Sequence, residues 1–361
     1  MPALPIREAF TAETIGVYFN NYQLTSNLPP YLGAGLFPSI KKPGLELKWI
    51  KGSKGLPVAL KPSNYDALAT VRDRIGFKEM ETEMPFFRES YIVKEKDEQE
   101  YENYMNSSDP ALANEVLNNI MLQPVELING ANVVPERMIW QLLAPIDGSP
   151  KIAISANNVN YDYNYDVDGE FKANNFLELT GTDMWSDTEN SDPVADIEAM
   201  QDKAEEKGVK LTVMVCSKAT MNNLRDNKKI QSYISAKSTT AVVRFTKKMV
   251  QEYLYEELGI TVVIYALQYK DESGVAHKFY PDITVTLLPG LESLGSTCYG
   301  KTPEERSASN SGAEVSIVGT GVAVETYTTE HPVNTHCVVA EIVLPSFERM
   351  DEVYVIKVKA A

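Results

Sequence analysis

Alternating apolar and charged residues near the N-terminus predict a long β-hairpin. Leu45, Leu47 and Trp49 alternate with charged residues, and a second extended run covers residues 77–93. Polar residues with glycine and proline separate the two runs. Because a two-stranded ribbon is only marginally stable in water, we expect the hairpin to pack against something outside itself.

Residues 1–43, ahead of the hairpin, predict an arm rather than a domain. A short amphipathic segment carries Ala12, Ile15, Phe19 and Tyr22, and a turn-rich stretch with several prolines and glycines follows it. A segment of this length and composition cannot form a hydrophobic core alone.

A long helix is predicted from residue 110. Asp109 fits the N-cap position and Pro110 the first turn. Apolar residues then recur at helical spacing, at Leu112, Val116, Leu117, Ile120 and Met121. Pro124 predicts a kink or an interruption, after which the helical pattern resumes over residues 133–143. We therefore expect one long broken helix of about thirty residues, well above the mean length of globular helices.

Two strands are predicted after this helix, over residues 151–156 and 161–167. The second strand places tyrosines on one face and polar residues on the other: Tyr161, Tyr163 and Tyr165 against Asp162, Asn164 and Asp166. Asp168 and Gly169 supply a turn.

Residues 191–288 predict a compact α/β unit. Its elements, in order, are a helix from Asp192 to Gly208, a strand over 211–216, a helix capped by Ser217, a helix over 246–258, a buried strand after Gly259 and a strand over 283–288. Two more strands, over 337–344 and 353–359, end the chain. An arm and a coreless hairpin beside a compact unit suggest a subunit that its neighbours complete.

Composition places the chain among ordinary soluble globular proteins. Its 361 residues are 43% hydrophobic and 23% charged, which fits about two domains. Lys and Arg together number 34 and Asp and Glu number 50, so the net charge is −16. Such a chain repels phosphate, which argues against tight, direct binding of nucleic acid and suits a surface that must not adhere to DNA.

The cysteines and the apolar runs exclude two further classes. Cys216, Cys298 and Cys337 are odd in number and widely spaced, which fits neither a disulfide framework nor a zinc site, so we expect reduced thiols in cytoplasm. The longest apolar stretch, 260–267, is too short to span a bilayer, and the N-terminus has no signal-peptide pattern. We expect no membrane association.

One segment matches a nucleotide-binding motif. Gly295 to Thr302, GSTCYGKT, fits G-x-x-x-x-G-K-[ST], in which backbone N–H groups hold phosphates, Lys301 reaches the β and γ charges and Thr302 binds magnesium. The context is unfavourable, because Pro303 follows directly and no later strand ends in an aspartate suited to magnesium. An NTP-binding enzyme is therefore the alternative function, although we expect no enzyme.

Other candidate chemistry has less support. Asn164, Asp166, Asp168 and Gly169 imitate the start of a calcium loop, but Asn175 occupies the position of the bidentate glutamate, so a strand and a turn fit better. The three histidines are scattered, and no serine or cysteine lies in a nucleophile elbow. We expect no catalytic residue, no cofactor and no metal.

Several longer segments are specific enough to compare with known families. MWSDTENSDPVADIEAMQDKAEEKG, which starts at Met184, precedes the strand LTVMVC, and VVIYALQYKDESGVAHKFYPDITVTLLPG follows further on. TCYGKTPEE comes next, and Asp109 to Ala111, DPA, stands before the long helix. In residues and in order, these landmarks resemble the lambda-type major capsid proteins (protein E family) of tailed bacteriophages over nearly the whole chain. The departures are Pro303 and Glu304 after Gly300, and residues 307–329 match no segment.

The resemblance implies an α+β protein with the Hong Kong 97-like phage capsid fold. The expected parts are an N-terminal arm (1–43), an extended β-hairpin loop (44–93), a peripheral domain with the spine helix (94–190), an axial α/β domain with the following connection (191–330) and C-terminal strands that return to the peripheral domain (331–361). It also implies a major capsid protein that assembles into hexamers and pentamers of an icosahedral shell around double-stranded DNA.

Partners and location follow from the same resemblance. The expected partners are other copies of the chain, a scaffold or maturation protease, a portal and a decoration protein. Packaged DNA would be touched only non-specifically. The expected location is the virion, and the host cytoplasm before assembly.

We expect apolar residues of the hairpin and the arm to make the contacts between copies, as in other obligate interfaces. These residues are Leu45, Leu47, Trp49, Phe86 and Phe87 in the hairpin, and Phe10 and Phe19 in the arm. The alternative for each of them is an ordinary core position within its own chain.

Overall fold

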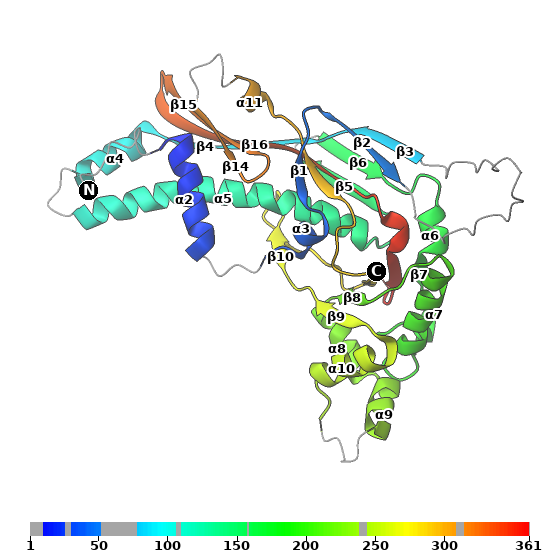
Figure 1. Ribbon diagram of the computed structural model, residues 1–361. Coiled ribbons are helices and arrows are strands. Elements are labelled where there is room, and N and C mark those ends of the chain that lie inside the picture. Colours follow the sequence, from blue (N-terminus) through cyan, green and yellow to red (C-terminus); the bar gives the residue numbers. More distant parts are fainter. Residues whose placement is uncertain are drawn as a thin grey trace, which may run out of the picture. The chain divides into compact units, whose positions relative to one another are not determined.

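The computed structural model describes residues 10–25, 30–51, 78–105, 110–156, 159–237, 244–307 and 314–360. The chain divides into two compact units. Unit 1 comprises Met1–Lys48, Glu81–Glu136 and Ser296–Ser346, and unit 2 comprises Trp49–Met80, Arg137–Gly295 and Phe347–Ala361. Each unit is therefore built from segments that lie far apart in the sequence (Figure 1).

Unit 1 is built on a six-stranded sheet. Its strand order is β1 (Ser39–Lys41), β13 (Ser296–Tyr299), β16 (Val333–Ser346), β15 (Val322–Glu330) and β14 (Glu314–Val318), and β4 (Phe86–Val93) also pairs with β16. The pairs are antiparallel except for β1 with β13. With 14 residues, β16 is long enough to pair with β15, β4 and β13 along different parts of its length.

The N-terminal helix α2 (Ala12–Thr25) belongs to the core of unit 1. It contacts β14 and β15, and Phe10, Ile15 and Phe19 pack with strand and helix residues in one apolar cluster. The hairpin β14–β15, which no sequence pattern predicted, supplies the surface that covers this segment. Unit 1 also contains the short helices α3 (Leu32–Leu36), α4 (Glu95–Met105) and α11 (Pro303–Ser307).

The spine helix is continuous. Helix α5 (Pro110–Leu143) has 34 residues and contains Pro124 and Pro135, so an interruption at Pro124, one of the two predicted outcomes, is wrong. A proline inside a helix removes one backbone hydrogen bond, but Met121, Val125 and Ile128 around it are buried, and tertiary packing supplies most of the stability of a helix in a protein. The predicted N-cap, Asp109, lies outside the described residues.

Unit 2 is built on a five-stranded sheet. Its order is β7 (Phe176–Glu178), β17 (Tyr354–Lys357), β12 (Thr284–Leu288), β8 (Val213–Cys216) and β9 (Thr261–Ile264). The C-terminal strand β17 therefore joins β12, from the predicted axial domain, to β7, from the predicted peripheral segment. The expected boundaries at residues 190 and 330 do not coincide with the division into units, because pairings distant in sequence tie these segments together.

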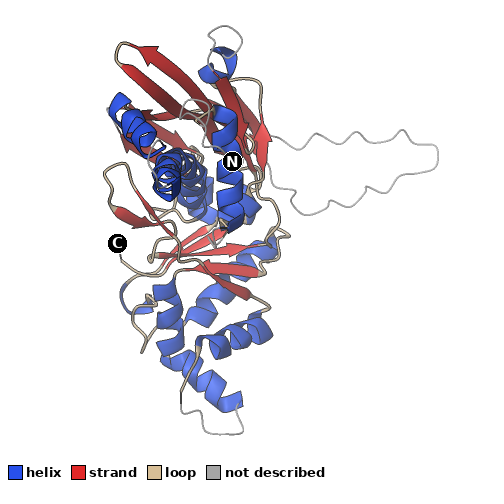
Figure 2. Cartoon of the chain, turned by 90° about the vertical axis from the view of Figure 1, so that its left-hand side faces the viewer, coloured by secondary structure: helices blue, strands red, loops and turns tan. Residues whose placement is uncertain are grey.

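Helices α7 (Pro193–Glu206), α8 (Lys218–Asp226), α9 (Lys228–Lys237) and α10 (Lys247–Leu258) cover one face of this sheet (Figure 2). Their apolar residues form one core with Met214, Leu287 and Ile356 of the strands. On the other face the Thr286 hydroxyl donates a hydrogen bond to the Leu143 carbonyl over 2.7 Å. The central strands β8 and β12 are therefore buried on both faces, as the apolar run over 211–216 predicted. The strand β9 was also predicted to be buried, but its Thr261 is exposed and its last two residues are half-buried.

The helix boundaries in unit 2 confirm the predictions from local sequence. Asp192, Ser217 and Thr246 cap α7, α8 and α10, each accepting a hydrogen bond from the backbone N–H three residues later, over 3.2–3.3 Å. Gly259 ends α10 with a φ of 67°, a conformation that glycine adopts without a steric cost.

Three two-stranded sheets complete the fold. They are β2 (Glu46–Lys51) with β3 (Lys78–Glu83), β5 (Lys151–Ala156) with β6 (Val159–Asn164), and β10 (Gln268–Lys270) with β11 (Ala276–Lys278). After β6, the Asp166 carboxylate accepts the backbone N–H groups of Phe171 and Lys172 over 2.9 and 3.0 Å at the start of α6 (Glu170–Asn174). The segment that imitates a calcium loop is therefore a turn that opens a short helix.

Candidate assembly surface

The base of the predicted hairpin is present, with β2 paired to β3. Lys48 and Glu81 form an ion pair of 2.7 Å on its exposed side. Leu47 is fully buried, and the ring of Trp49, which is 7% exposed, lies 5.2 Å from the ring of Tyr165. The inner side of β2 is thus covered within its own chain, which corrects the expectation of a hairpin with no burial of its own. Residues 52–77 lie outside the described residues.

The second predicted run is two strands rather than one. It breaks at Met84 and Pro85, and β4 then pairs with β16 from Phe86 opposite Ile342 to Val93 opposite Thr335. Phe86 and Phe87 are therefore half-buried residues of the sheet in unit 1 rather than of a free hairpin. The extended loop ends near residue 83, ten residues earlier than expected, because a proline favours a break between strands.

The strand β4 is an edge strand in the described part of the sheet, where it pairs with β16 alone. Arg88, Glu89 and Ser90 are exposed along it. The Arg88 guanidinium lies 5.4 Å from the centre of the Phe86 ring and 3.4 Å from a Glu304 carboxylate oxygen. Charged residues on an edge strand oppose backbone pairing with a strand of another chain. A contact at this edge would therefore be made through side chains.

The predicted contact residues fall into two groups. Phe10, Phe19, Leu47 and Trp49 are buried within their own chain, as the local-core alternative proposed. Leu45 is 36% exposed, and its carbonyl accepts the N–H of Met84 over 2.9 Å, which places it beside the segment that leads into β4. Leu45, Phe86 and Phe87 thus retain accessible apolar surface near the hairpin base.

Several exposed apolar side chains of unit 1 were missed from the sequence. They are Val17 of α2, Ile92 of β4, Ile317 of β14 and Tyr327 of β15. Ile92 could have been found from the alternation along β4, where its neighbour Val93 is buried. The exposure of the others depends on how α2 packs on the β14–β15 hairpin, which local patterns do not reveal.

The nucleotide-binding motif does not form a phosphate-binding loop. Ser296–Tyr299 is strand β13, whose backbone pairs with β1 and β16, so its N–H groups do not converge on a phosphate. Thr302 is buried, and its hydroxyl accepts the N–H of Glu305 over 3.4 Å while Glu305 accepts the N–H of Thr302 over 3.3 Å. This reciprocal cap begins α11, a helix of five residues. The alternative of an NTP-binding enzyme therefore loses its structural basis.

Buried titratable groups do not assemble a reaction site. Burial raises the pKa of the Cys216 and Cys337 thiols to about 12, which keeps both protonated. Glu341 of β16 is 1% exposed, and neither of its carboxyl oxygens has a hydrogen-bond partner in the described part of the chain. Burial raises the pKa of Glu341 well above its usual range, which favours the protonated form of this carboxyl.

The described residues offer neither a metal centre nor a membrane-spanning helix. They contain no group of three or more histidine, cysteine, aspartate or glutamate side chains arranged to hold a metal ion. Their helices include none with both the length and the apolar character that crossing a membrane requires.

The fold is similar to solved phage proteins. A protein assigned as the capsid protein of a prophage of Escherichia coli CFT073 is 15% identical, with a TM-score of 0.57 over 97% of this chain and 99% of that chain. A phage-related protein from Bordetella bronchiseptica RB50 is 14% identical, with a TM-score of 0.52 over 96% and 98%. The capsid of cyanophage A-1(L) is 12% identical, with a TM-score of 0.49 over 91% and 92%. The architecture is the mixed α+β, Hong Kong 97-like fold of phage capsid proteins.

A search of the curated proteins found no significant match to the sequence. The family model for phage major capsid protein E matches residues 11–358. The chain therefore belongs to the phage major capsid protein E family. The match confirms the resemblance inferred from the collinear sequence landmarks, and it identifies the chain as a structural protein of phage capsids.

Proposed function

We propose that copies of this chain form the hexamers and pentamers of a closed icosahedral shell around the double-stranded DNA of a tailed phage or prophage. The observation that carries the proposal is the family match over residues 11–358, on a fold similar to phage capsid proteins. The net charge of −16 supports it, because an acidic inner wall repels packaged DNA and leaves only non-specific contact.

Leu45, Phe86 and Phe87 are the proposed contact residues between copies. They retain accessible apolar area near the hairpin base, and such area is buried when obligate interfaces form. Leu47 and Trp49 act indirectly in this proposal, because their burial holds β2 in place beside Leu45. The mechanism is assembly rather than turnover. A scaffold or maturation protease, a portal and a decoration protein are the further partners, and the host cytoplasm is the place of assembly before the virion.

Sedimentation velocity of the purified full chain over a range of concentrations tests this proposal. We expect large closed particles above a threshold concentration, and a rise of about tenfold in that threshold for Leu45→Asp, because a buried charge at an interface costs more than 1.4 kcal/mol. Val275→Asp is the matched control, since Val275 is 53% exposed on the β10–β11 turn of unit 2. A wild-type chain that stays monomeric at every concentration and salt would contradict the proposal, and tubes or small rings would instead indicate a tail or decoration component.

A further inference from the structure

One stretch of unit 2 has a charge opposite to that of the rest of the chain. Residues 207–248, which we call the basic segment, hold 10 Lys and Arg and one Asp, a net charge of +9. The other 319 residues therefore carry −25. The basic segment contains β8, helices α8 and α9 and the start of α10. A concentration of cations in an otherwise acidic chain indicates an anionic partner.

The lysines of the basic segment lie where they are unfavourable for the chain itself. The N-terminus of a helix carries a partial positive charge, so acidic residues are favoured in its first turn, and α4 and α7 have them. Helices α8, α9 and α10 have no acidic residue there. They begin instead with lysines: Lys218 in α8, Lys228 and Lys229 in α9, and Lys247 and Lys248 in α10. A bound anion explains three successive exceptions, whereas the stability of the single chain does not.

Two of these five lysines are already paired within unit 2. The Lys229 amine lies 3.1 Å from an Asp192 carboxylate oxygen, and the Lys248 amine lies 3.4 Å from one of Glu252. The other three form no ion pair with any residue that the structure describes, and we call them the unpaired lysines: Lys218, Lys228 and Lys247.

The unpaired lysines lie toward one end of the unit 2 sheet. Strands β8 and β9 are parallel, and Lys218 begins α8 just after β8 ends. Helix α10 leads back into β9, so its first turn lies toward the same carboxyl end. Burial raises the pKa of Cys216, the last residue of β8, to about 12, and the nearby Lys247 ammonium opposes this shift. Lys228 lies beside the start of α7, because its N–H donates to the Thr188 carbonyl over 2.8 Å, and α7 leads into β8 as α10 leads into β9.

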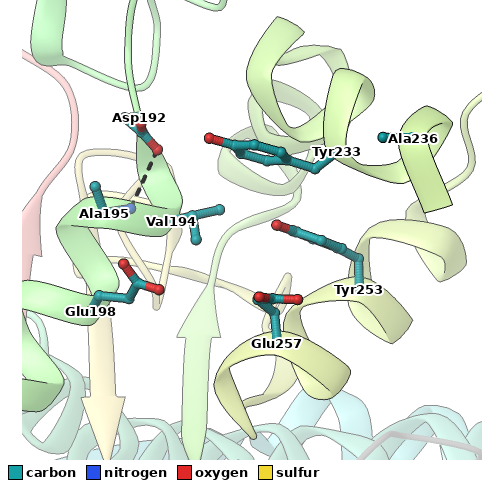
Figure 3. Close-up of a pocket in the computed structure, with 8 residues that line it drawn as sticks. All are labelled: Asp192, Val194, Ala195, Glu198, Tyr233, Ala236, Tyr253 and Glu257. Atoms are coloured by element: carbon teal, nitrogen blue, oxygen red, sulfur yellow. Dashed lines mark hydrogen bonds between the residues drawn. The ribbon is translucent and has the colours of Figure 1, made fainter.

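Carboxylates of unit 2 form a separate surface. Asp192, Glu198 and Glu257 line a hollow of about 420 Å³ among α7, α9 and α10 (Figure 3). None of the residues that line this hollow is a lysine or an arginine. The unpaired lysines therefore belong to a different surface of the unit.

Double-stranded DNA is the anion that this surface fits best. Phosphate oxygens accept hydrogen bonds from lysines and from the N–H groups at helix N-termini, and the starts of α8, α9 and α10 offer both. A duplex presents a row of phosphates, which suits lysines distributed over three helices rather than gathered around one point. The charge of −25 on the rest of the chain repels the duplex elsewhere, so the contact is confined to the basic segment.

We propose that the unpaired lysines at the starts of α8, α9 and α10 bind the phosphate backbone of double-stranded DNA without sequence specificity. This inference rests on the proposed shell-building function, and it adds to it the surface of the subunit that touches the packaged DNA. The contact is weak and sensitive to salt, because it is electrostatic and the chain as a whole is negative.

Binding of DNA by the unassembled full chain tests this inference. The probe is a fluorescein-labelled duplex, and its fluorescence anisotropy is measured at chain concentrations at which sedimentation velocity shows no particles. With a duplex of about 20 bp in about 50 mM KCl we expect a dissociation constant of about 10 μM, which rises steeply with salt.

Two triple variants separate this surface from general charge effects. Lys218→Gln with Lys228→Gln and Lys247→Gln should weaken DNA binding about tenfold and reduce the salt dependence, as the slope of log K against log[salt], by about 2 to 3. The control removes three exposed lysines of unit 2 outside the basic segment and should change binding little: Lys172→Gln, Lys203→Gln and Lys270→Gln.

Thermal unfolding of both variants checks that the fold is intact. The first triple variant should be at least as stable as the wild type, because it removes cations from the positive ends of three helices. Weaker DNA binding by this variant would then come from the lost lysines and not from unfolding.

The outcomes are distinct. A wild-type chain that does not bind the duplex at low salt overturns this inference, and so do equal losses of binding in the two triple variants. If the first triple variant binds DNA normally but assembles only at a higher concentration, the unpaired lysines contact an acidic surface of a second copy, and the inference is also overturned. Each of these results leaves the proposed function in place, whereas a wild-type chain that never assembles overturns the proposed function whatever its binding of DNA.

Discussion

The two large sheets of this protein bury different chemistry. In unit 2, the buried positions of β8, β12 and β17 are apolar or carry a neutral thiol or hydroxyl, and the Thr286 hydroxyl donates a hydrogen bond to the Leu143 carbonyl of α5. The hydroxyls of Thr284 and Tyr354 have no hydrogen-bond partner in the described residues, but they carry no charge. In unit 1, β16 buries the carboxyl of Glu341 with no hydrogen-bond partner in the described residues, directly opposite Phe87 of β4 in the register. Burying an unpaired carboxyl lowers stability. The sheet beside the proposed contacts therefore buries an ionisable group without a hydrogen-bond partner in the described residues, whereas the unpartnered polar groups in the sheet of unit 2 are neutral hydroxyls.

The largest expected change in the free energy of unfolding comes from a substitution in the core of unit 2. Leu287→Ala should lower the free energy of unfolding of the unassembled chain by about 3 kcal/mol, because it deletes a fully buried side chain and leaves a cavity. Denaturant titration measures this loss. Leu291→Ala is the control, since Leu291 is 51% exposed in the same unit and should change little. A loss below about 1 kcal/mol for Leu287→Ala would show that this side chain is not tightly packed in the core of unit 2.

In unit 1, one substitution is expected to raise the free energy of unfolding. Glu341→Met should raise the free energy of unfolding at pH 8 by about 2 kcal/mol, because a flexible apolar side chain of similar length replaces a buried carboxyl that lacks a partner. The same titration measures it. Glu89→Met on the exposed edge strand β4 is the control, with little expected change. Destabilisation by Glu341→Met would show that this carboxyl is satisfied and that the two sheets do not differ as described.

The pH dependence of stability tests the burial of Glu341 separately. Burial raises the pKa of Glu341 in the folded chain above the value of about 4.3 expected in the unfolded chain. The stability of the wild-type chain is therefore greatest below about pH 4.3 and falls as the pH rises through the folded pKa, because ionisation of the buried carboxyl is costly. Glu341→Gln cannot ionise, so the difference in stability between this variant and the wild type should grow with pH over that window. A constant difference from pH 4 to pH 8 would contradict this assignment.

The smallest expected effect concerns the hydroxyl groups of unit 2. Thr286→Val removes the hydrogen bond to the Leu143 carbonyl and should lower the free energy of unfolding by about 1 kcal/mol. Thr261→Val, at an exposed position of β9 in the same sheet, is the matched control. Equal effects of the two substitutions would mean that the buried hydroxyl adds nothing to this sheet.

The sequence was most informative where the signal is local. The caps at Asp192 and Ser217 and the stop at Gly259 were predicted, because each depends on residues within one turn, whereas Thr246 was expected inside the helix that it caps. An interruption at Pro124 did not occur, because burial of the neighbouring residues outweighs the lost hydrogen bond. Long-range features such as the place of β17 and the β14–β15 hairpin carry no local pattern, so they could not be predicted.

The candidate surface was only partly predictable for the same reason. Alternation correctly placed Leu47 and Trp49 on one face of β2, but it could not show that Tyr165, more than a hundred positions later, covers Trp49. The role of Phe10 and Phe19 likewise depends on a surface supplied by strands near the C-terminus. The family, in contrast, was recognisable from the sequence, because its landmarks are segments whose order along the chain can be seen without the fold.

Electron cryo-microscopy of the particles formed by the purified chain tests the central claim most directly. We expect closed icosahedral shells in which a neighbouring copy covers Leu45, Phe86 and Phe87 of each copy. Particles in which these side chains face solvent, or a preparation that contains only single chains, would contradict it.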